Sequence, residues 1–583
     1  MSRKRQKVKS IQKINIEIIP FAFIASIVPL IVYLHIQKLD PIEAGNWNGN
    51  STYADLLSYC KSVWFIIASS IAFCVFIYKN IRGRFQYKKS YIYVPALIYM
   101  FFIVLSAVTS KYSHIALFGF VSRYEGMFVL LFYLIDFLLI FYLIREEKQI
   151  KIILVSLLIS SAIIGLIGLS QFSGHDFFST SFGKMLIMPR QYLLSEMSFN
   201  FGKMIYSTLS NPNYIGSYVD MLLPISIISF CFVKKHVFKI MVGLLNILLL
   251  INLFGSGSSA GYIGLALGIL LLLIIFRKSI FKNKITTGGF IIIALVGCSI
   301  FGLKMYTDLK NDLSAQSYYL KDIVFEDKSV SIVSKTETLK IQYADTHLSF
   351  YDTDNNALSF NAEETDQLKT IVFNDSKYKN YILTLSGDIL KIKNSGVQFE
   401  FRVGTDTLRV IGVNGDEPNK IEKPDSIDID GYEKLGSARG YIWSRTIPLL
   451  KDAVILGSGP DTFAVKFPQN DYIGKINAYG LLHIIVDKPH NMYLQIAMNT
   501  GVFSLLAFLA LIGIYIISGI KIYFSRRERD FTTLSGIGVF VSICSYLAAG
   551  FFNDSVVSVA PVFWILLGIG FACNDLIRKE SNN

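Results

Sequence analysis

Long apolar runs recur along this chain, and they constrain its fold more than any other feature. Each run is about 20 residues long, which is the length that an α-helix needs to cross a bilayer. Hydrophobic residues make up 52% of the 583 residues and charged residues only 17%, so a purely soluble enzyme is excluded. The sequence therefore predicts an all-α polytopic membrane protein with about 12 transmembrane helices, at residues 17–37, 62–78, 91–109, 126–144, 150–171, 213–233, 239–255, 260–276, 285–305, 499–520, 533–551 and 557–575.

The distribution of basic residues predicts the orientation of these helices. If the basic N-terminal segment is cytoplasmic and the helices alternate, Lys and Arg number 27 in the inner segments and 7 in the short outer loops. Positive charge is retained on the cytoplasmic side of membrane proteins, so both termini are expected in the cytoplasm of a bacterial cell. The formal net charge of +13 is thereby explained without a nucleic-acid partner.

The segment from about 306 to 488 interrupts the apolar pattern, and the alternation puts it outside the cytoplasm. Polar and apolar residues alternate within it, which is typical of strands, and turn pairs such as Asp354-Asn355 and Ser386-Gly387 separate them. It is expected to hold an inserted extracytoplasmic β-rich module with strands at 338–343, 347–351, 369–373, 381–385 and 397–403.

From Gly436 to Pro460 the apolar period becomes helical, which predicts an amphipathic helix on the outer membrane face. The expected organisation is a set of four segments: nine transmembrane helices at 1–305, the β-rich module at 306–435, the amphipathic helix and a functional loop at 436–498, and three transmembrane helices at 499–583.

Unusual polar motifs open several of the predicted helices, all on the outer side. Helix N-termini present free N–H groups and the positive end of the helix dipole, so their convergence predicts an anion site at the outer interface. The motifs are Ser122–Gly126 before the fourth helix, Ser210–Tyr214 before the sixth, Gly255–Gly261 before the eighth and Lys488–Asn491 before the tenth.

These motifs, in this order, resemble the bacterial O-antigen ligase and O-antigen polymerase superfamily. Its members are polytopic glycosyltransferases that act on undecaprenyl-pyrophosphate-linked glycans outside the cytoplasm. The resemblance covers about residues 90–575 without the β-rich module. It is carried by Arg123-Tyr-Glu-Gly126, Leu209–Tyr218, Arg439 with Trp443, Gly457–Phe463, and His490-Asn491 followed after nine residues by Gly501.

Two positions depart from the family pattern. Ser504 stands where the family has Gly, Thr or Tyr, and Ser258-Ser259 replaces the Ser-Arg that is common in the Gly/Ser turn.

The resemblance implies a transfer that needs a base for the acceptor hydroxyl and cations for the departing pyrophosphate. His490 is the expected base, because its place at a helix start disfavours the imidazolium form. Arg123 and Arg439 are expected to act with it, since a guanidinium binds phosphate oxygens bidentately. No metal ion and no cofactor are expected. Residues expected to bind substrate are Arg445, Asn211, Asn213, Tyr214 and Asn491.

Each of these residues also has a structural alternative. Arg123 can anchor a helix end at the interface, and Arg439 and Arg445 can form the solvated face of an amphipathic helix. Asn211-Pro212-Asn213 is also a common turn and helix start. His490 can be an interfacial histidine bonded to a carbonyl.

Alternative functions also remain open at this point. Asp136 and Asp220 lie inside predicted helices, where a charge needs a partner or a polar cavity; such residues are typical of a transporter or flippase. A non-enzymatic scaffold that binds envelope glycan would explain the β-rich module equally well. The expected partners of an enzyme are undecaprenyl-pyrophosphate-linked oligosaccharide, a glycan, protein or lipid acceptor, and membrane lipids, and the sequence does not separate a ligase from a polymerase.

Overall fold

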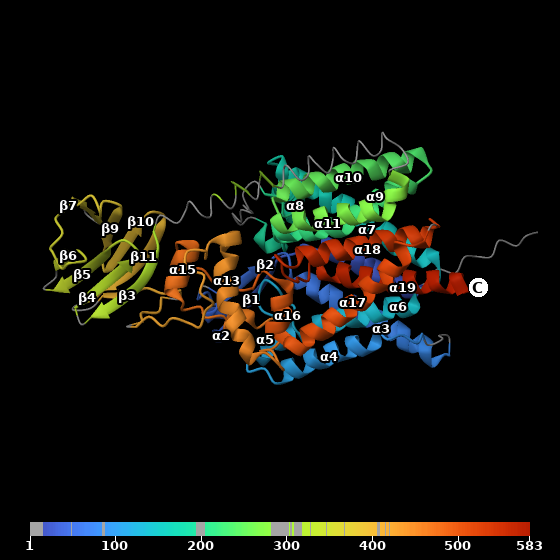
Figure 1. Cartoon of the computed structure of the whole chain (residues 1–583), viewed down its shortest axis with the longest axis horizontal. Coiled ribbons are helices and arrows are strands. Elements are labelled where there is room, and N and C mark those ends of the chain that lie inside the picture. Colours follow the sequence, from blue (N-terminus) through green and yellow to red (C-terminus); the bar gives the residue numbers. More distant parts are fainter. Residues whose placement is uncertain are drawn as a thin grey trace, which may run out of the picture.

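The protein consists of a helical body and a β-rich module that projects from one end of it (Figure 1). The computed structural model describes residues 16–582, apart from residues 48, 84–87, 194–203, 281–301, 304–305, 308–309, 311–317, 327, 345–346, 366–367, 405–407, 414, 419 and 527.

Eight of the described helices are long and apolar enough to cross a membrane. Three shorter apolar helical segments accompany them, and each of these eleven elements overlaps a predicted helix. The predicted helix at 285–305 lies almost entirely outside the described residues, so the count of twelve stays a prediction. The long helices are α3 (Tyr59–Ile81), α7 (Glu147–Phe172), α9 (Pro212–Phe232), α10 (His236–Ser256), α11 (Ser259–Ile280), α17 (Val502–Tyr523), α18 (Phe531–Ala549) and α19 (Ala560–Asn582), and the shorter segments are α1 (Ile19–Ser26) with its flanking turns, α4 (Tyr93–Val108) and α6 (Met127–Leu143).

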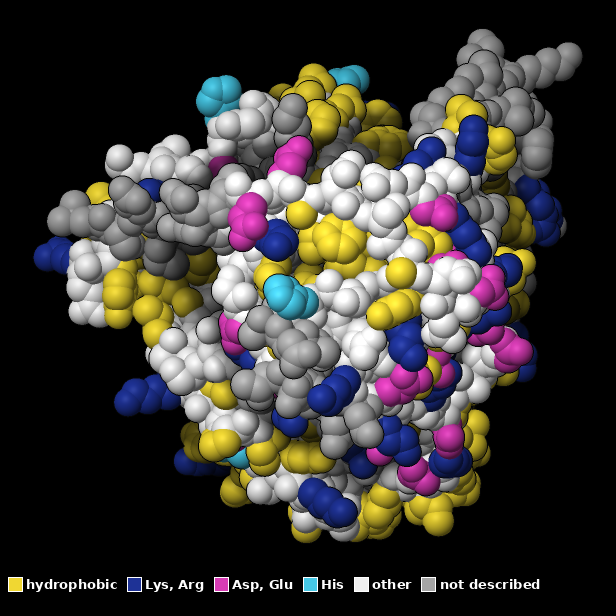
Figure 2. Space-filling view, turned by 90° about the vertical axis from the view of Figure 1, so that its left-hand side faces the viewer, with side chains coloured by type: hydrophobic (Ala, Val, Ile, Leu, Met, Phe, Trp, Pro, Cys, Tyr) yellow, Lys and Arg dark blue, Asp and Glu magenta, His cyan; other side chains and the backbone are white. Residues whose placement is uncertain are grey.

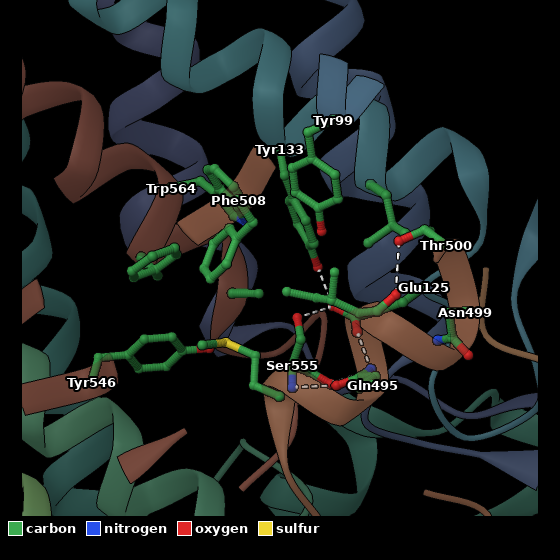
Figure 3. A pocket seen from close by; sticks show the side chains of 15 residues that line it. Tyr99, Glu125, Tyr133, Gln495, Asn499, Thr500, Phe508, Tyr546, Ser555 and Trp564 are labelled. Atoms are coloured by element: carbon green, nitrogen blue, oxygen red, sulfur yellow. Dashed lines mark hydrogen bonds between the residues drawn. The ribbon is translucent and has the colours of Figure 1, made fainter. Parts of the chain in front are cut away.

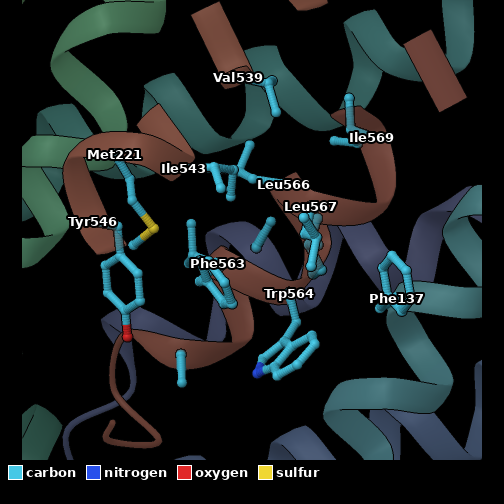
Figure 4. Packing of buried hydrophobic residues seen from close by; sticks show 14 of the residues in the cluster. Phe137, Met221, Val539, Ile543, Tyr546, Phe563, Trp564, Leu566, Leu567 and Ile569 are labelled. Carbon is cyan, nitrogen blue, oxygen red and sulfur yellow. The ribbon is translucent and has the colours of Figure 1, made fainter. Parts of the chain in front are cut away.

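Helices α18 and α19 form the centre of the helical body. They are apolar on all sides, which suits a helix surrounded by other helices, and α18 packs against α9 and α11 while α19 packs against α6. Figure 4 shows Phe563 and Trp564 of α19 among side chains of α6, α9 and α18. A Cβ at Gly568 would lie 2.9 Å from the Ile140 side chain, so this glycine permits the close approach of α19 and α6.

The first apolar segment is shorter than the predicted helix at 17–37. Its helical part ends at Leu30, directly after Pro29. Pro29 has no backbone N–H group to donate to a continuing helix. The chain then forms β1 (His35–Lys38), which pairs antiparallel with β2 (Thr52–Asp55) and encloses the short helix α2 (Pro41–Gly45). This N-terminal hairpin was not predicted from the sequence.

The β-rich module contains two antiparallel sheets in which each strand pairs with its neighbour in sequence. All five predicted strands are present, as β5, β6, β8, β9 and β11. The four-stranded sheet contains β3 (Leu320–Glu326), β4 (Ser329–Ser334), β5 (Thr338–Ala344) and β6 (His347–Tyr351), and the six-stranded sheet contains β7 (Phe360–Thr365), β8 (Leu368–Phe373), β9 (Tyr381–Ser386), β10 (Ile389–Asn394), β11 (Val397–Val403) and β12 (Leu408–Val410).

One face of the six-stranded sheet supplies much of the core of the module. Ile371, Leu383, Ile392 and Phe399 are cross-strand neighbours on four successive strands, and all are buried. Helix α15 (Tyr472–Tyr479) contributes to the same apolar cluster, so it fastens the module to the segment that leads to α16. The end of the module carries interspersed acidic and basic side chains (Figure 2).

A helix is present where an amphipathic helix was predicted, but it is shorter than expected and has positive φ values at Gly436, Ser437 and Ala438. Helix α13 (Leu435–Leu449) is followed by a single 3-10 turn that ends at Asp452, so the helical period does not continue to Pro460. Pro448 and the positive φ of Gly459 (118°) are incompatible with a longer regular helix.

Candidate functional site

The candidate site lies at the end of the helical body that carries the β-rich module. It is built from the loops before α6 and α9, the loop before helix α16 (Met492–Thr500), the loop between α18 and α19, and the Gly457–Phe463 motif. These segments are far apart in the sequence, and buried polar contacts join them.

Arg123 forms the central ion pair of the site. Its Nε donates a hydrogen bond to Oδ1 of Asp461 at 2.7 Å, and both side chains are buried. Burial alone would lower the pKa of Arg123, but the charges of Asp461 and Asp554 raise it above its ordinary value. The guanidinium therefore stays charged. A buried charge is tolerated here because it is paired and hydrogen-bonded.

The local backbone explains how this pair is positioned. Ser122 and Tyr124 on either side of Arg123 have positive φ values of 67° and 53°, a conformation that is uncommon outside glycine and often found at functional sites. The Asp461 carboxylate also accepts hydrogen bonds from the backbone N–H groups of Phe120 (2.8 Å) and Glu125 (3.1 Å). Asp461 thus fixes the whole Arg123 loop.

The guanidinium of Arg123 is not fully used by these contacts. Its Nη2 lies 3.5 Å from the carbonyl oxygen of Ser555, and its buried Nη1 has no hydrogen-bond partner among the described residues. Leaving a buried donor unpaired is costly, so Nη1 marks a position for an acceptor group that the protein itself does not supply.

Arg123 lines a cavity of about 520 Å³ together with Lys488. The Lys488 ammonium lies 3.4 Å from Oδ2 of Asp487 and 5.7 Å from the ring centre of Tyr214. Burial lowers the pKa of Lys488, but the charge of Asp487 and the nearby Asp554 raise it above the ordinary value. Two permanent cations therefore share this cavity with the carboxyl groups of Asp55 and Asp487, and the unpaired Nη1 of Arg123 is available to an anion that the described residues do not supply.

His490 lies next to a second buried carboxylate. Its Nδ1 is 3.1 Å from Oδ2 of Asp554, an ion-pair distance, although the angle falls short of a good hydrogen bond. Burial raises the pKa of Asp554, but His490 and then Arg123 and Lys488 lower it to about 2. Asp554 is therefore ionised, and a proton on Nδ1 of His490 leaves Nε2 free as an acceptor.

His490 and Arg123 are connected through Asp554 rather than through a direct contact. His490 is not among the described residues that line the 520 Å³ cavity, and its side chain is 25% exposed. Asp554 interacts with both cations of the cavity and with His490, so the two predicted residues belong to one charged cluster.

Glu125 and Gln495 hold the loop that carries Asp554. Ser555, which follows Asp554, donates from its backbone N–H to Oε1 of Gln495 (2.8 Å) and from its hydroxyl to Oε1 of Glu125 (3.0 Å). On the other side, Asn553 donates to the carbonyl oxygen of Asn213 at 2.9 Å. The hydrogen bonds of Asn553 and Ser555 thus fix the position of Asp554 from both sides.

Glu125 itself lies in a small internal cavity of about 30 Å³ (Figure 3). The Tyr133 hydroxyl donates to it at 2.7 Å, and the nearest cation, Nη2 of Arg123, is 4.0 Å away. Burial raises the pKa of Glu125 to about 7, against the opposing effect of Arg123. Its carboxyl group is therefore half protonated near neutral pH.

The structure places Arg439 beside the same loop. Its Nε and Nη2 both donate to the carbonyl oxygen of Phe552, at 3.2 and 2.7 Å, and its Nη1 donates to that of Gly436 at 2.6 Å. Trp443, one turn further along α13, donates from Nε1 to the carbonyl oxygen of Pro489 at 2.8 Å. Helix α13 thus contacts both the Asp554 loop and the residue before His490.

The other predicted substrate-binding residues differ in their surroundings. Arg445 is directed to α15, where its Nε donates to Oδ2 of Asp471 at 2.8 Å, and no described contact joins it to His490. Asn211 and Asn491 each cap a helix, α9 and α16, as the structural alternative for Asn211 predicted. Asn211 and Tyr214 nevertheless line the 520 Å³ cavity.

Two intramembrane carboxyl groups were expected to have partners. Asp136 accepts a hydrogen bond from the Ser69 hydroxyl at 2.6 Å. Neither carboxyl oxygen of Asp220 has a hydrogen-bond partner among the described residues, so the expected alternative of a polar cavity stays a prediction for Asp220.

Several residues of the site were missed as individuals by the sequence reasoning. Asp461, Glu125 and Lys488 were seen only as members of motifs, and Asp554 was not singled out. The available signal for Asp554 was an Asn-Asp pair in a very short loop between two apolar helices. Its pairing with His490 joins residues that are 64 positions apart, which sequence spacing alone does not reveal.

The comparison with protein families found a match. Residues 244–509 match the family model described as O-antigen ligase. This part of the chain is similar to O-antigen ligases. The match contains Arg439, Asp461 and His490, and it confirms the superfamily inferred from the motifs. It supports an enzyme of the O-antigen ligase or polymerase type, and with the apolar helices it indicates a multi-pass bacterial membrane protein.

No curated protein and no solved structure matches the chain.

The raised pKa of Glu125 predicts a pH-dependent stability. Because the folded protein binds this proton more tightly than the unfolded chain, the stabilisation is fully present below about pH 4.5 and is lost as the pH rises to about 7. We expect the melting temperature of the purified protein to fall between about pH 5 and pH 8, and to fall less in Glu125→Gln. Glu364→Gln, at an exposed position of β7, is the matched control. The same pH dependence in Glu125→Gln and in the unaltered protein would contradict the assignment.

Proposed function

We propose that this protein transfers a glycan from undecaprenyl pyrophosphate to an acceptor hydroxyl at the outer face of the cytoplasmic membrane. The observation that carries the proposal is the charged cluster in which Asp554 connects His490 to the cavity of Arg123 and Lys488. In this cluster His490 is suited to accept a proton, and Arg123 with Lys488 is suited to bind a phosphate-containing leaving group.

The acceptor hydroxyl is activated by His490. Nε2 of the ring takes the hydroxyl proton while the oxygen attacks the anomeric carbon of the donor sugar. The ionised Asp554 stabilises the imidazolium that forms, as carboxylates do in other acid–base pairs. The partly exposed position of His490 leaves the ring accessible to an acceptor.

The pyrophosphate is held by Arg123 and Lys488. As the bond between the anomeric carbon and the pyrophosphate oxygen breaks, the electron pair moves to that oxygen, and the unpaired Nη1 of Arg123 supplies a donor for it. The two fixed cations supply the charge neutralisation that other enzymes obtain from a metal ion. A single displacement of this kind inverts the anomeric centre.

The proposed orientation of the protein in the membrane follows the positive-inside rule. The candidate site and the β-rich module lie at the same end of the helical body, and the C-terminus lies at the opposite end (Figure 1). An outer site suits a lipid-linked donor, because nucleotide sugars are cytoplasmic. Arg439, Asn213 and Tyr214 then support the site from α13 and α9, and both termini are cytoplasmic.

Labelling of single cysteines tests this topology. In a variant with the native cysteines replaced by serine, we expect a membrane-impermeant maleimide to label Ser395→Cys, in the turn between β10 and β11, in intact cells. Ser581→Cys, near the end of α19, should be labelled only after the cells are opened. Labelling of both positions in intact cells, or of neither, would contradict the proposed orientation.

Replacement of His490 tests the chemistry. Purified protein is incubated with undecaprenyl-pyrophosphate-linked oligosaccharide, with and without a second acceptor, and the released undecaprenyl pyrophosphate is measured. Acid–base catalysis typically contributes about 10²- to 10⁴-fold, so we expect His490→Ala to lose turnover by this factor. His175→Ala, at an exposed histidine, should retain full turnover.

The products of the same assay separate the alternatives. An elongated lipid-linked product indicates a polymerase, and transfer to another molecule indicates a ligase. Movement of intact donor across vesicles without bond cleavage would instead support a transporter, and binding without either would support a scaffold. Loss of transfer on addition of a chelator would contradict the role given to Arg123 and Lys488.

A further inference from the structure

The cavity that is lined by Arg123 and Lys488 also has aromatic lining residues. Trp47 and Tyr53 of the N-terminal hairpin line it together with Arg123 and Lys488. The Trp47 ring is edge-on to Tyr53, with ring centres 5.3 Å apart at 88°, and to Phe120, with ring centres 6.0 Å apart at 69°. Two neighbours thus hold the indole in place, and both lining rings remain only partly buried.

Polar groups surround the aromatic pair. Asp55, Ser58, Ser122, His483 and Asp487 line the same cavity. Oδ1 of Asp55 is fixed by the backbone N–H groups of Ser58 and Tyr59, each at 2.8 Å. Burial, followed by the charges of Asp55 and Asp487, raises the pKa of the Tyr53 hydroxyl above its ordinary value, so both carboxyl groups lie close to that hydroxyl.

This combination matches the chemistry of a sugar ring. A pyranose has an apolar C–H face, which packs on a flat aromatic side chain, and a rim of hydroxyl groups, which need donors and acceptors. Small-molecule sites generally combine an apolar wall with a few placed polar groups, in cavities of about 300–1,000 Å³. The 520 Å³ of this cavity accommodates a sugar and a pyrophosphate together.

We propose that Trp47, Tyr53 and His483 form a sugar subsite, here called the hairpin subsite, that binds a neutral or amino sugar next to the pyrophosphate position. The inference rests on the proposed function and specifies its substrate class. A sugar that is linked directly to pyrophosphate lies within one glycosidic bond of Arg123 and Lys488, so the hairpin subsite is adjacent to the scissile bond.

The charge of the subsite selects against acidic sugars. Asp55 and Asp487 line the same cavity as Arg123 and Lys488. Once the pyrophosphate occupies these two cations, neither remains to pair with the carboxylate of a uronic acid. In a partly buried site, a ligand binds more weakly if it carries a charge of the same sign as the site and no opposite charge compensates it. A neutral hexose or an N-acetylhexosamine presents only hydroxyl and amide groups, which His483 and the serine hydroxyls can bind.

Binding measurements with short donors test the subsite. The probes are geranyl pyrophosphate alone and geranyl pyrophosphate carrying one glucose, one N-acetylglucosamine or one glucuronic acid. We expect Trp47→Ala to weaken binding of the two neutral glycosylated probes by about 2- to 10-fold, the range of one aromatic contact, and to leave geranyl pyrophosphate binding unchanged. The glucuronic acid probe should bind more weakly than the neutral ones in the unaltered protein.

A second set of probes distinguishes donor sugar from acceptor sugar. Methyl glucoside and methyl N-acetylglucosaminide carry the same rings without pyrophosphate. A Trp47-dependent effect confined to the pyrophosphate probes assigns the subsite to the donor, and one that includes the methyl glycosides assigns it to the acceptor.

Two variants control for an indirect effect of Trp47. Trp47→Phe keeps an aromatic face and should restore most of the sugar affinity, and Trp64→Phe, at a half-exposed tryptophan of α3, should change nothing. Equal weakening of geranyl pyrophosphate by Trp47→Ala, unchanged sugar affinity, or tight binding of the glucuronic acid probe would overturn the proposal. Trp47-dependent sugar binding without any turnover would overturn the proposed function instead.

Discussion

The buried ion pair between Arg123 and Asp461 is the interaction on which the site depends. A guanidinium inside a protein must be paired, or its desolvation outweighs what it contributes. Asp461 pairs with Nε of Arg123 and also accepts hydrogen bonds from two backbone N–H groups of the Arg123 loop. One carboxylate therefore joins segments 338 positions apart and leaves Nη1 of Arg123 directed away from its internal partner.

The second carboxylate, Asp554, extends this arrangement to His490. Its low pKa is a consequence of His490, Arg123 and Lys488, whose combined effect outweighs its burial. Its loop is fixed by Glu125 and Gln495 through Ser555, and by Asn553 from the other side. The Arg123 motif and the His490 motif thus contribute to one site through polar contacts rather than through apolar packing alone, so a change at Glu125 is expected to affect both.

Much of this fold follows from the sequence because membrane helices and alternating strands have strong local patterns. The apolar runs predicted the described helices, and the period-2 segments predicted β5, β6, β8, β9 and β11. The N-terminal hairpin at 35–55 was missed because it directly follows an apolar run, where Pro29 ends the helix early. It is also the element that supplies Trp47 and Tyr53 to the cavity.

The individual residues of the site were only partly predictable. Motif spacing identified His490, Arg123 and Arg439, since these stand in recognisable patterns. The partners Asp461 and Asp554 depend on contacts between distant loops, which no local pattern encodes. Arg445 shares the helix and the charge of Arg439, yet it lies against Asp471, because residues six positions apart point to different sides of a helix.

The central claim is that Arg123 and Lys488 bind a polyprenyl pyrophosphate, and ³¹P NMR titration with geranyl pyrophosphate tests it most directly. A charge-assisted hydrogen bond contributes about 1.5–3 kcal/mol, so Arg123→Gln should weaken the affinity by about 10- to 150-fold. Lys488→Gln should weaken it as well, while Arg190→Gln, at an exposed arginine, should not. Unchanged affinity in both Arg123→Gln and Lys488→Gln would contradict the account.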